Sequence, residues 1–563
     1  MDLTTTLTGA LPAIILISAV LTAALSVVLL KLYRRAVIRS MATGGAVEQV
    51  ASVDASEVPS NPPPLAVNFL SSGIGLGGRA KSAYDQSSNA FRCRGLVYGV
   101  AGIVYALILS MPWMLTAEGG FPLMRLIWLL ICYAWPTVIV VIMVAASSRR
   151  EKRWLLIGYI SLVVVVGGFV IARNPDSSIG QLLFFWFYVN AAPTLLLSTF
   201  LWRRIRAVGP LVLIFMMAGV TGAEVFLSIT GNNDGVVRAF AAFGYMLGLD
   251  VNTVFLLIVL LGFVALGYWG WRLLGHLGHA YHLKGMSDQS LQIDALWLMF
   301  AIFQSITLVF EDWLWIFTGP VAFIIYKLIT GYGFGHFMPM NKNDRSPSLL
   351  LLRVFSLGRR SEALFDHLAK RWLQLGSIDM IAGPDLATST VEPHEFLDFV
   401  GGHLSRSFIN NAEDLNSRLA LRDTRPDPDG RFRTNEFFCR NDTWQMYMQH
   451  LATESDVVLM DLRSFGPSNQ GCLRELGQLM AGVSLKRILF MIDDSTDQDY
   501  LKQTFQTLWR QVPVSSPNLR EQAAQINVLI LPASSSMASD QMEKSLFQAL
   551  PARESEAKAG SPR

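Results

Sequence analysis

Long apolar runs constrain this chain more than any other feature of its sequence. A helix needs roughly 20 apolar residues to cross the hydrocarbon core of a bilayer, and residues 1–338 contain about nine runs of this kind. The first run is too long for a signal peptide and lacks a basic segment before it, so residues 1–39 are predicted to form a membrane anchor. Residues 95–338 are predicted to form a transmembrane helical bundle. The predicted spans are 11–30, 96–116, 126–146, 154–172, 182–202, 208–229, 251–271, 292–310 and 313–330.

The composition agrees with a membrane location. Hydrophobic residues make up 52% of the chain, charged residues only 16%, and the mean hydropathy is +0.38, on the apolar side of ordinary soluble composition. The net charge of +3 is too small to indicate a nucleic-acid partner, so the lipid bilayer is the partner that the composition favours. The four cysteines are scattered without metal-ligand spacing, which predicts neither a disulfide framework nor a metal site.

The charges of the loops predict the orientation of the bundle. Basic clusters follow spans one, three, five and seven, with the sequences KLYRR, RREKR, RRIR and WRLLGHLGHAYHLK. The alternate loops, such as TAEGGFP and TGNNDG, lack such clusters. Because cytoplasmic loops carry an excess of Lys and Arg, the pattern predicts a multi-pass protein of the inner or plasma membrane. Its N-terminus is expected outside, and everything after the last span in the cytoplasm.

Changes in composition mark three further segments. Residues 40–94 are rich in Ser, Gly, Pro and Ala and are predicted to be a flexible cytoplasmic linker. Residues 345–535 alternate strand-length apolar runs with helical patterns, which predicts a three-layer α/β domain with a mainly parallel sheet. Residues 536–563 are predicted to be a weakly ordered tail. The predicted strands are 349–356, 378–383, 433–439, 456–462, 487–493 and 527–532, and the predicted helices are 361–374, 392–408, 442–454, 470–482 and 498–511.

Polar residues follow three of the predicted strands. Ligands bind at the carboxyl ends of the strands in open parallel sheets, so these residues are the candidates for a binding site. Glycine lets the backbone approach a ligand, and arginine beside a helix N-terminus suits phosphate. After the fourth strand, Asn469 or Ser468 is expected to cap the next helix. The candidate residues are Ser356, Gly358, Arg359 and Arg360 after the first strand, Gly383, Asp385 and Thr388 after the second, and Asp461, Arg463, Asn469, Cys472 and Glu475 after the fourth.

A family resemblance covers the same residues. The run SDVVLMDLRSFGPSNQGCLREL resembles the strand, loop and S-x-W-C-x-x-E-L helix of TIR domains, with Cys472 and Glu475 at the C-x-x-E positions. The run RVFSLGRRSEALFDHLAKRWLQLG is similar to the first strand and helix of that family. The fourth-strand region also looks like nucleoside 2-deoxyribosyltransferases, in which an aspartate precedes G-x-x-x-E-L-G; Asp461 and Glu475 match these positions, whereas the TIR tryptophan is Gly471 here. Both resemblances imply a flavodoxin-like fold.

The resemblance implies an N-glycosidase. Breaking an N-ribosyl bond develops positive charge on the sugar, which a carboxylate beside the anomeric carbon stabilises. On this basis Glu475 and Asp461 are expected to be catalytic, and the other candidates to bind a nucleotide such as NAD, which serves as substrate with no further cofactor. The resemblance also implies a homo-oligomer acting in signalling or defence.

Three alternatives stay open. Glu475 is also explained as an ordinary acid near a helix N-terminus, where the helix dipole stabilises it. The second alternative is that the protein is a non-catalytic membrane-tethered sensor or scaffold. A transporter or channel regulated by the α/β domain is the third alternative, and it would need a polar path past Glu224, an ionisable residue inside a predicted span.

Overall fold

Two compact units make up this computed structural model. The first, here called the helical unit, contains residues 1–33, 92–339 and 391–402; the second, the α/β unit, contains residues 34–91, 340–390 and 403–563. The residues that the structure describes are 3–42, 62–70, 78–116, 122–144, 149–174, 178–200, 205, 208–231, 233–309, 313–338, 346–353, 368–382, 391, 393–402, 404, 408–409, 419, 422–439, 444–467, 469–520, 523–531 and 535–550.

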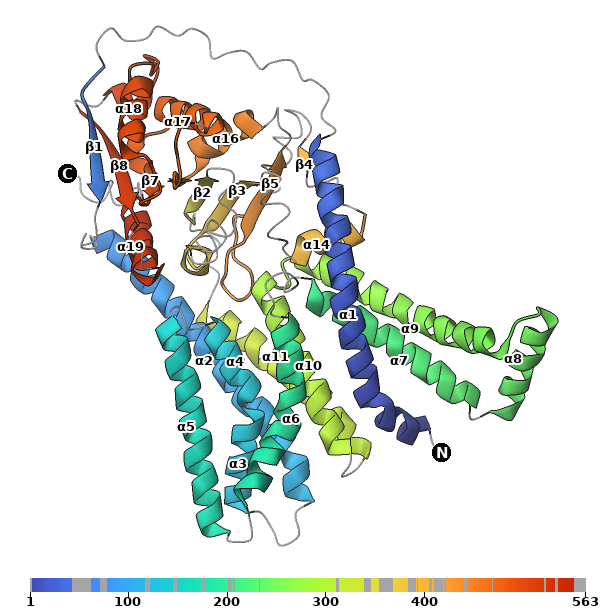
Figure 1. Cartoon of the computed structure of the whole chain (residues 1–563). Helices are drawn as coiled ribbons and strands as arrows, with labels where there is room; N and C mark the ends of the chain where they lie inside the picture. Colours follow the sequence, from blue (N-terminus) through green and yellow to red (C-terminus); the bar gives the residue numbers. More distant parts are fainter. Residues whose placement is uncertain are drawn as a thin grey trace. The chain divides into compact units, whose positions relative to one another are not determined.

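Long helices build the helical unit (Figure 1). Proline and side-chain caps mark where some of them begin: Pro210 is the second residue of α7, and the Asn233 side chain accepts hydrogen bonds from the backbone of Gly235 and Val236 at the start of α8. The helices are α1 (Leu3–Ala42), α2 (Gly78–Leu115), α3 (Leu123–Tyr133), α4 (Trp135–Val144), α5 (Arg149–Arg173), α6 (Ile179–Phe200), α7 (Gly209–Gly231), α8 (Asp234–Met246), α9 (Val251–His282), α10 (Asp288–Val309), the 3-10 helix η1 (Trp313–Phe317), α11 (Thr318–Phe337) and α14 (Pro393–Val400).

Seven of the described helices are long and apolar enough to cross a membrane, namely α1, α2, α5, α6, α7, α9 and α11. The pair α3 and α4 is bent by 42° and makes an eighth span if it is counted as one. The structure therefore agrees with a helical membrane unit, but the described residues do not confirm the predicted number of nine. The predicted span 292–310 corresponds to α10, which is outside these eight and carries Asp288, Gln292 and Asp294 near its start.

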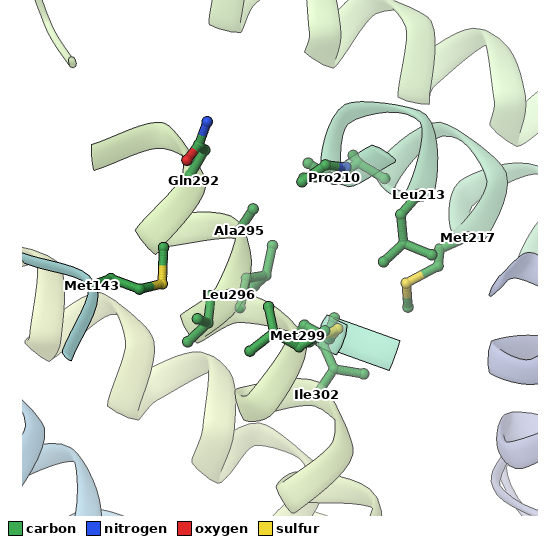
Figure 2. A pocket seen from close by; sticks show the side chains of 12 residues that line it. Met143, Pro210, Leu213, Met217, Gln292, Ala295, Leu296, Met299 and Ile302 are labelled. Atoms are coloured by element: carbon green, nitrogen blue, oxygen red, sulfur yellow. The ribbon is translucent and has the colours of Figure 1, made fainter. Parts of the chain in front are cut away.

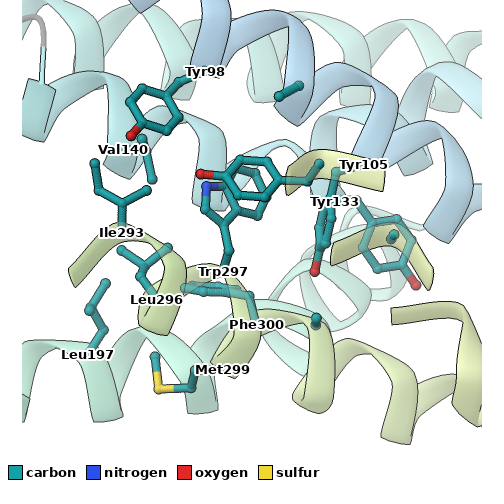
Figure 3. Packing of buried hydrophobic residues seen from close by; sticks show 14 of the residues in the cluster. Tyr98, Tyr105, Tyr133, Val140, Leu197, Ile293, Leu296, Trp297, Met299 and Phe300 are labelled. Atoms are coloured by element: carbon teal, nitrogen blue, oxygen red, sulfur yellow. The ribbon is translucent and has the colours of Figure 1, made fainter. Parts of the chain in front are cut away.

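Aromatic side chains fill the core of the helical unit around α10 (Figure 3). The Trp297 ring lies 4.6 Å from the ring of Tyr105 and 4.7 Å from that of Tyr326, measured between centroids. A buried polar chain runs beside this cluster: the Tyr105 hydroxyl donates to Gln304 Oε1 at 2.8 Å, and Gln304 Nε2 donates to Asn190 Oδ1 at 3.2 Å. These bonds tie α2, α10 and α6 together and fix their register.

Glycine allows α7 and α9 to pack backbone against backbone. A Cβ atom on Gly222 would lie 2.2 Å from the Gly262 carbonyl oxygen, and one on Gly262 would lie 2.4 Å from the Gly222 carbonyl oxygen. No larger residue fits at either position without moving the two helices apart. Small residues of this kind are typical of close helix pairs in membranes.

Helix α14 belongs to the helical unit although it follows a strand of the α/β unit in the chain. The Tyr33 hydroxyl donates to Glu395 Oε2 at 3.1 Å, and the Tyr33 ring packs edge-on against Phe399. At the end of α9, His282 Nε2 lies 3.0 Å from Asp398 Oδ1. Contacts with α1 and α9 therefore hold α14 in place.

An eight-stranded, entirely parallel sheet forms the α/β unit, in the order β1-β8-β7-β6-β2-β3-β5-β4. Seven strands come from the C-terminal part of the chain. The strands are β1 (Leu65–Leu70), β2 (Ser348–Arg353), β3 (Ser377–Ala382), β4 (Phe408–Ile409), β5 (Thr434–Cys439), β6 (Val457–Asp461), β7 (Ile488–Ile492) and β8 (Ala524–Ile530).

Helices bury both faces of this sheet. Leu350 and Leu352 of β2 belong to the core formed with α16 (Trp444–Glu454), α17 (Gln470–Gly482) and α18 (Gln498–Trp509), whereas Leu349 and Leu351, equally buried, point to the other face. The short helical segment 368–372 and α19 (Ser535–Gln548) meet through the rings of Trp372 and Phe547, which stack 6.2 Å apart. Burial on both faces explains the continuous apolar runs of these strands.

The structure confirms the parallel sheet and differs from the sequence-based expectation at its edges. The six predicted strands correspond to β2, β3, β5, β6, β7 and β8, while β1 and β4 were missed. The expected flexible linker, 40–94, contains β1 and the start of α2. Among the described residues of the expected helix 392–408, Pro393–Val400 forms α14, and part of the expected tail forms α19. The stretch DPDG is a turn in which Gly430 has φ +74°, a conformation that favours glycine.

Candidate functional site

The candidate residues that the structure describes lie where the sheet reverses its order. From β2 the chain continues to its neighbour β3, and it later returns to the other side of β2 as β6. The carboxyl ends of β2 and β6 thus flank a switch point, and the Cα atoms of Arg353 and Asp461 are partners in the register. Such points are the usual ligand sites of open parallel sheets.

Asp461 and Arg463 form a buried ion pair at the end of β6. The guanidinium donates from Nε to Oδ1 at 2.8 Å and from Nη2 to Oδ2 at 2.7 Å, and the backbone N–H of Arg463 donates to Oδ1 at 3.1 Å. Burial alone would lower the pKa of Arg463, but the Asp461 carboxylate, with a contribution from Asp493, raises it. Both oxygens of the Asp461 carboxylate are therefore engaged in hydrogen bonds with Arg463.

The loop that follows carries an unusual backbone conformation. Ser464 has φ +59°, a value that few residues other than glycine adopt and that recurs at functional sites. Its hydroxyl lies 2.9 Å from that of Ser495 in the loop after β7. A second tie joins the same loops, because the Thr496 hydroxyl donates to the Leu462 carbonyl at 3.0 Å. The ends of β6 and β7 therefore form one connected rim.

Cys472 and Glu475 lie on the inward face of α17. Cys472, Leu476 and Leu479 of this face are buried in the core against the sheet, and Glu475 is only 3% exposed. Burial, together with smaller contributions from the Glu475 and Asp461 carboxylates, raises the pKa of the Cys472 thiol to about 12. The thiol stays protonated at neutral pH, so it is not a nucleophile in this state.

The Glu475 carboxyl group is the least satisfied member of the cluster. Its Oε2 atom is buried and has no hydrogen-bond partner among the described residues. Burial raises the pKa of this carboxyl to about 8, so it is mostly protonated at neutral pH. A buried oxygen without a partner costs roughly 1–3 kcal/mol, which a donor from a ligand would offset. The group is thus suited to accept a hydrogen bond or to face a developing positive charge.

The structure brings together five of the predicted site residues, Asp461, Arg463, Asn469, Cys472 and Glu475, on β6, the following loop and α17. Asn469 does not cap α17, because its Oδ1 accepts a hydrogen bond from the Gly466 N–H at 3.0 Å and so shapes the loop. The remaining predicted residues lie outside the described part of the chain: Ser356, Gly358, Arg359, Arg360, Gly383, Asp385 and Thr388, together with the alternative cap Ser468.

Asp493 is a residue of this rim that the sequence analysis missed. It follows β7 directly, accepts a hydrogen bond from the Ser495 N–H at 3.0 Å and lies close enough to Arg463 to raise its pKa. The rule that selected Asp461, a polar residue immediately after a buried strand, would also have selected Asp493. Within the described ranges, no group of His, Cys, Asp and Glu side chains has the arrangement of a metal site.

Two described ionisable residues of the helical unit pair with each other. Asp294 of α10 and Lys327 of α11 pair at 2.6 Å, which satisfies both charges. Glu224 of α7 is half-buried.

Comparison with known proteins adds no relative from which a role could be transferred to these residues. No family model matches the chain, and neither a curated protein nor a solved structure matches it.

Proposed function

We propose that this chain is a multi-pass membrane protein whose cytoplasmic α/β unit binds a nucleotide such as NAD and cleaves its N-glycosidic bond. Glu475 is the catalytic carboxyl group in this proposal. One observation carries it: a buried carboxyl oxygen without a partner in the described structure, on the helix that follows β6 at the switch point of the sheet. A ribose hydroxyl would supply the missing donor.

The strand order supports a flavodoxin-like fold for this unit. Five neighbouring strands, β3-β2-β6-β7-β8, form the centre of the sheet. If only these five are renumbered in chain order, their order is 2-1-3-4-5, which is typical of flavodoxin-like sheets. The strands β5 and β4 are added at one edge and β1 at the other. In that fold a nucleotide binds outside the carboxyl ends of the central strands. Arg353 at the end of β2 is the register partner of Asp461, and we assign Arg359 and Arg360, which follow it in the sequence, to phosphate.

The protonation state of Glu475 fits a substrate with a cationic leaving group. Burial disfavours the charge on this carboxyl, so it keeps its proton at neutral pH unless a ligand changes its surroundings. The positive charge of a nicotinamide ring, and that developing on the ribose during cleavage, would favour the carboxylate and lower its pKa. Asp461 acts as a positioning residue, since its carboxylate holds Arg463.

Nicotinamide release by the full-length protein in nanodiscs tests this function. Because the reactive form is the carboxylate, kcat/KM is expected to rise with pH and to level off above about pH 8. Glu475→Gln should lower nicotinamide release about a hundredfold or more. The matched control is Asp499→Asn, which changes an exposed carboxyl on α18 and should leave turnover unchanged. Equal turnover in wild type and Glu475→Gln would contradict the catalytic role.

Parity fits the nine-span topology that we propose, and it equally fits a seven-span one in which neither α3–α4 nor α10 crosses. Strand β1, before α2, pairs with β8, so the chain must return to the same side of the membrane between β1 and β2. An even number of crossings is then required, and α2, the α3–α4 pair, α5, α6, α7, α9, α10 and α11 supply it. If α3–α4 crosses, α10 must cross too. With α1 this gives the nine spans, with the N-terminus outside and the basic start of α5 in the cytoplasm.

Labelling of single cysteines checks this orientation. In a cysteine-free background, a membrane-impermeant maleimide is expected to label Asp234→Cys, at the exposed start of α8, in intact cells. Lys152→Cys, at the exposed start of α5, should be labelled only after the membrane is permeabilised. The reverse labelling pattern would show that the topology is inverted. Labelling of both sites in intact cells would place them on the same side of the membrane and contradict the proposed crossings.

A sensor role is the second candidate, and α14 favours it. The connection from β3 to β4 carries this helix, which α1 and α9 hold within the helical unit. A rearrangement of α1 or α9 would therefore act on α14, which the chain joins to the end of β3 through residues 383–392. If the nanodisc-embedded protein shows no turnover with NAD or other nucleotides, a homo-oligomeric sensor that binds its ligand without cleaving it becomes the better account.

A further inference from the structure

A groove of the helical unit is almost entirely apolar. It lies between α4, α6, α7 and α10, and twelve side chains line it (Figure 2). The only polar one among them is the amide of Gln292, for which the described structure contains no hydrogen bond. Three of the others are methionines, Met143, Met217 and Met299, whose flexible side chains adapt to ligands of irregular shape.

The groove has the length of one leaflet. On α10 its lining extends from Gln292 to Ile302, which at about 1.5 Å per residue corresponds to roughly 15 Å. The hydrocarbon core of a bilayer is roughly 30 Å thick, so this is about half of it. On α7 the lining covers only the first turns, from Pro210 to Met217. A transmembrane helix of a second copy would need a groove that continues through both leaflets, whereas an acyl chain needs only one.

The polar end of the groove faces the basic side of the protein. Gln292 and Pro210 lie at the starts of α10 and α7, and Met143 and Leu197 lie in the last turns of α4 and α6. In the topology proposed above, all four positions are at the cytoplasmic interface. The same interface carries the exposed Arg150, Lys152 and Arg153 at the start of α5, and each Lys or Arg near a membrane surface attracts anionic lipid by about 1 kcal/mol.

We propose that this groove binds one acyl chain of an anionic phospholipid of the cytoplasmic leaflet. The headgroup lies at the basic interface, the Gln292 amide donates to its ester or phosphate oxygens, and the chain runs along α10 toward Ile302. This proposal rests on the orientation proposed above but not on the nucleotide chemistry. The labelling experiment tests that orientation separately.

Lipid retention tests the site directly. Full-length protein is equilibrated with mixed phosphatidylglycerol and phosphatidylcholine vesicles, extracted in mild detergent and examined by native mass spectrometry. Wild type should retain phosphatidylglycerol in preference to phosphatidylcholine. Ala295→Phe places a ring in the middle of the groove and should reduce this retention about tenfold. Ala191→Phe, at an exposed position of α6 outside the groove, is the matched control and should retain lipid as wild type does.

A second variant guards against misfolding of the first. Ile302→Trp narrows the inner end of the groove and should shift retention from oleoyl toward lauroyl phosphatidylglycerol without abolishing it. Equal retention in Ala295→Phe and wild type would overturn the proposal, as would equal retention of the two headgroups. A dimeric wild type that Ala295→Phe converts to a monomer, with lipid retention unchanged, would assign the groove to a second copy instead.

Discussion

Glu475→Gln is expected to stabilise the α/β unit at alkaline pH and to leave its stability almost unchanged at pH 5. The folded carboxyl keeps its proton up to about pH 8, whereas an unfolded glutamate loses it near pH 4.5. Between these values the folded state binds more protons, so the free energy of unfolding of the wild type falls as pH rises. Glutamine does not titrate and escapes this loss.

The size of this effect follows from the shift in pKa. Each pKa unit corresponds to about 1.4 kcal/mol, so the wild type should lose roughly 3–5 kcal/mol between pH 4.5 and pH 8 relative to the variant. For a unit of this size that corresponds to roughly 5–15 °C in apparent unfolding temperature. Thermal unfolding of the full-length protein, recorded from pH 5 to pH 9, measures the difference.

Asp494→Asn is the control for this experiment. It removes an exposed carboxyl from the loop after β7 and should give no pH-dependent difference from wild type. If Glu475→Gln and wild type keep the same difference in unfolding temperature at every pH, the Glu475 carboxyl is ionised in the folded protein. The proposed protonation state is then wrong.

Asp461→Asn is expected to destabilise the α/β unit by about 3 kcal/mol. The substitution removes the charge that the buried Arg463 guanidinium contacts through two hydrogen bonds, and breaking a buried pair from one side leaves an uncompensated charge. The nearby Asp493 offsets part of this loss. Chemical denaturation of the full-length protein, followed by a probe in the α/β unit, measures the change.

A double-mutant cycle separates the ion pair from other effects. The double variant Asp461→Asn with Arg463→Met removes both charges and should be more stable than Asp461→Asn alone. The matched control, Arg425→Met, removes an exposed arginine and should not rescue Asp461→Asn. Additive effects of Asp461→Asn and Arg463→Met would show that the two side chains do not depend on each other.

The central strands could be predicted because burial on both faces leaves a clear trace in the sequence. Runs such as LLLLR, VVLMD and ILFMI are short and apolar and alternate with helical patterns, which is typical of buried strands between helices. Strand β1 left no such trace. Its six residues stand among proline, glycine and serine, and it pairs with β8, more than 450 positions away, so no local pattern indicates it.

The candidate site could be predicted in part for the same kind of reason. Cys472, Glu475, Leu476 and Leu479 recur at helical spacing, which places them on one face of α17. The pairing of Arg463 with Asp461 depends on side-chain conformation at the end of β6, and sequence spacing does not determine this. The partners of α14 were likewise inaccessible, because an amphipathic helix shows which face is apolar but not which surface covers it.

A structure of the full-length protein with NAD, determined by cryo-electron microscopy in nanodiscs, tests the central claim most directly. The account predicts a nucleotide outside the carboxyl ends of β2 and β6, with a ribose hydroxyl within hydrogen-bond distance of the Glu475 carboxyl. Saturating NAD bound elsewhere, or a Glu475 carboxyl that remains enclosed without contact to the ligand, would contradict it.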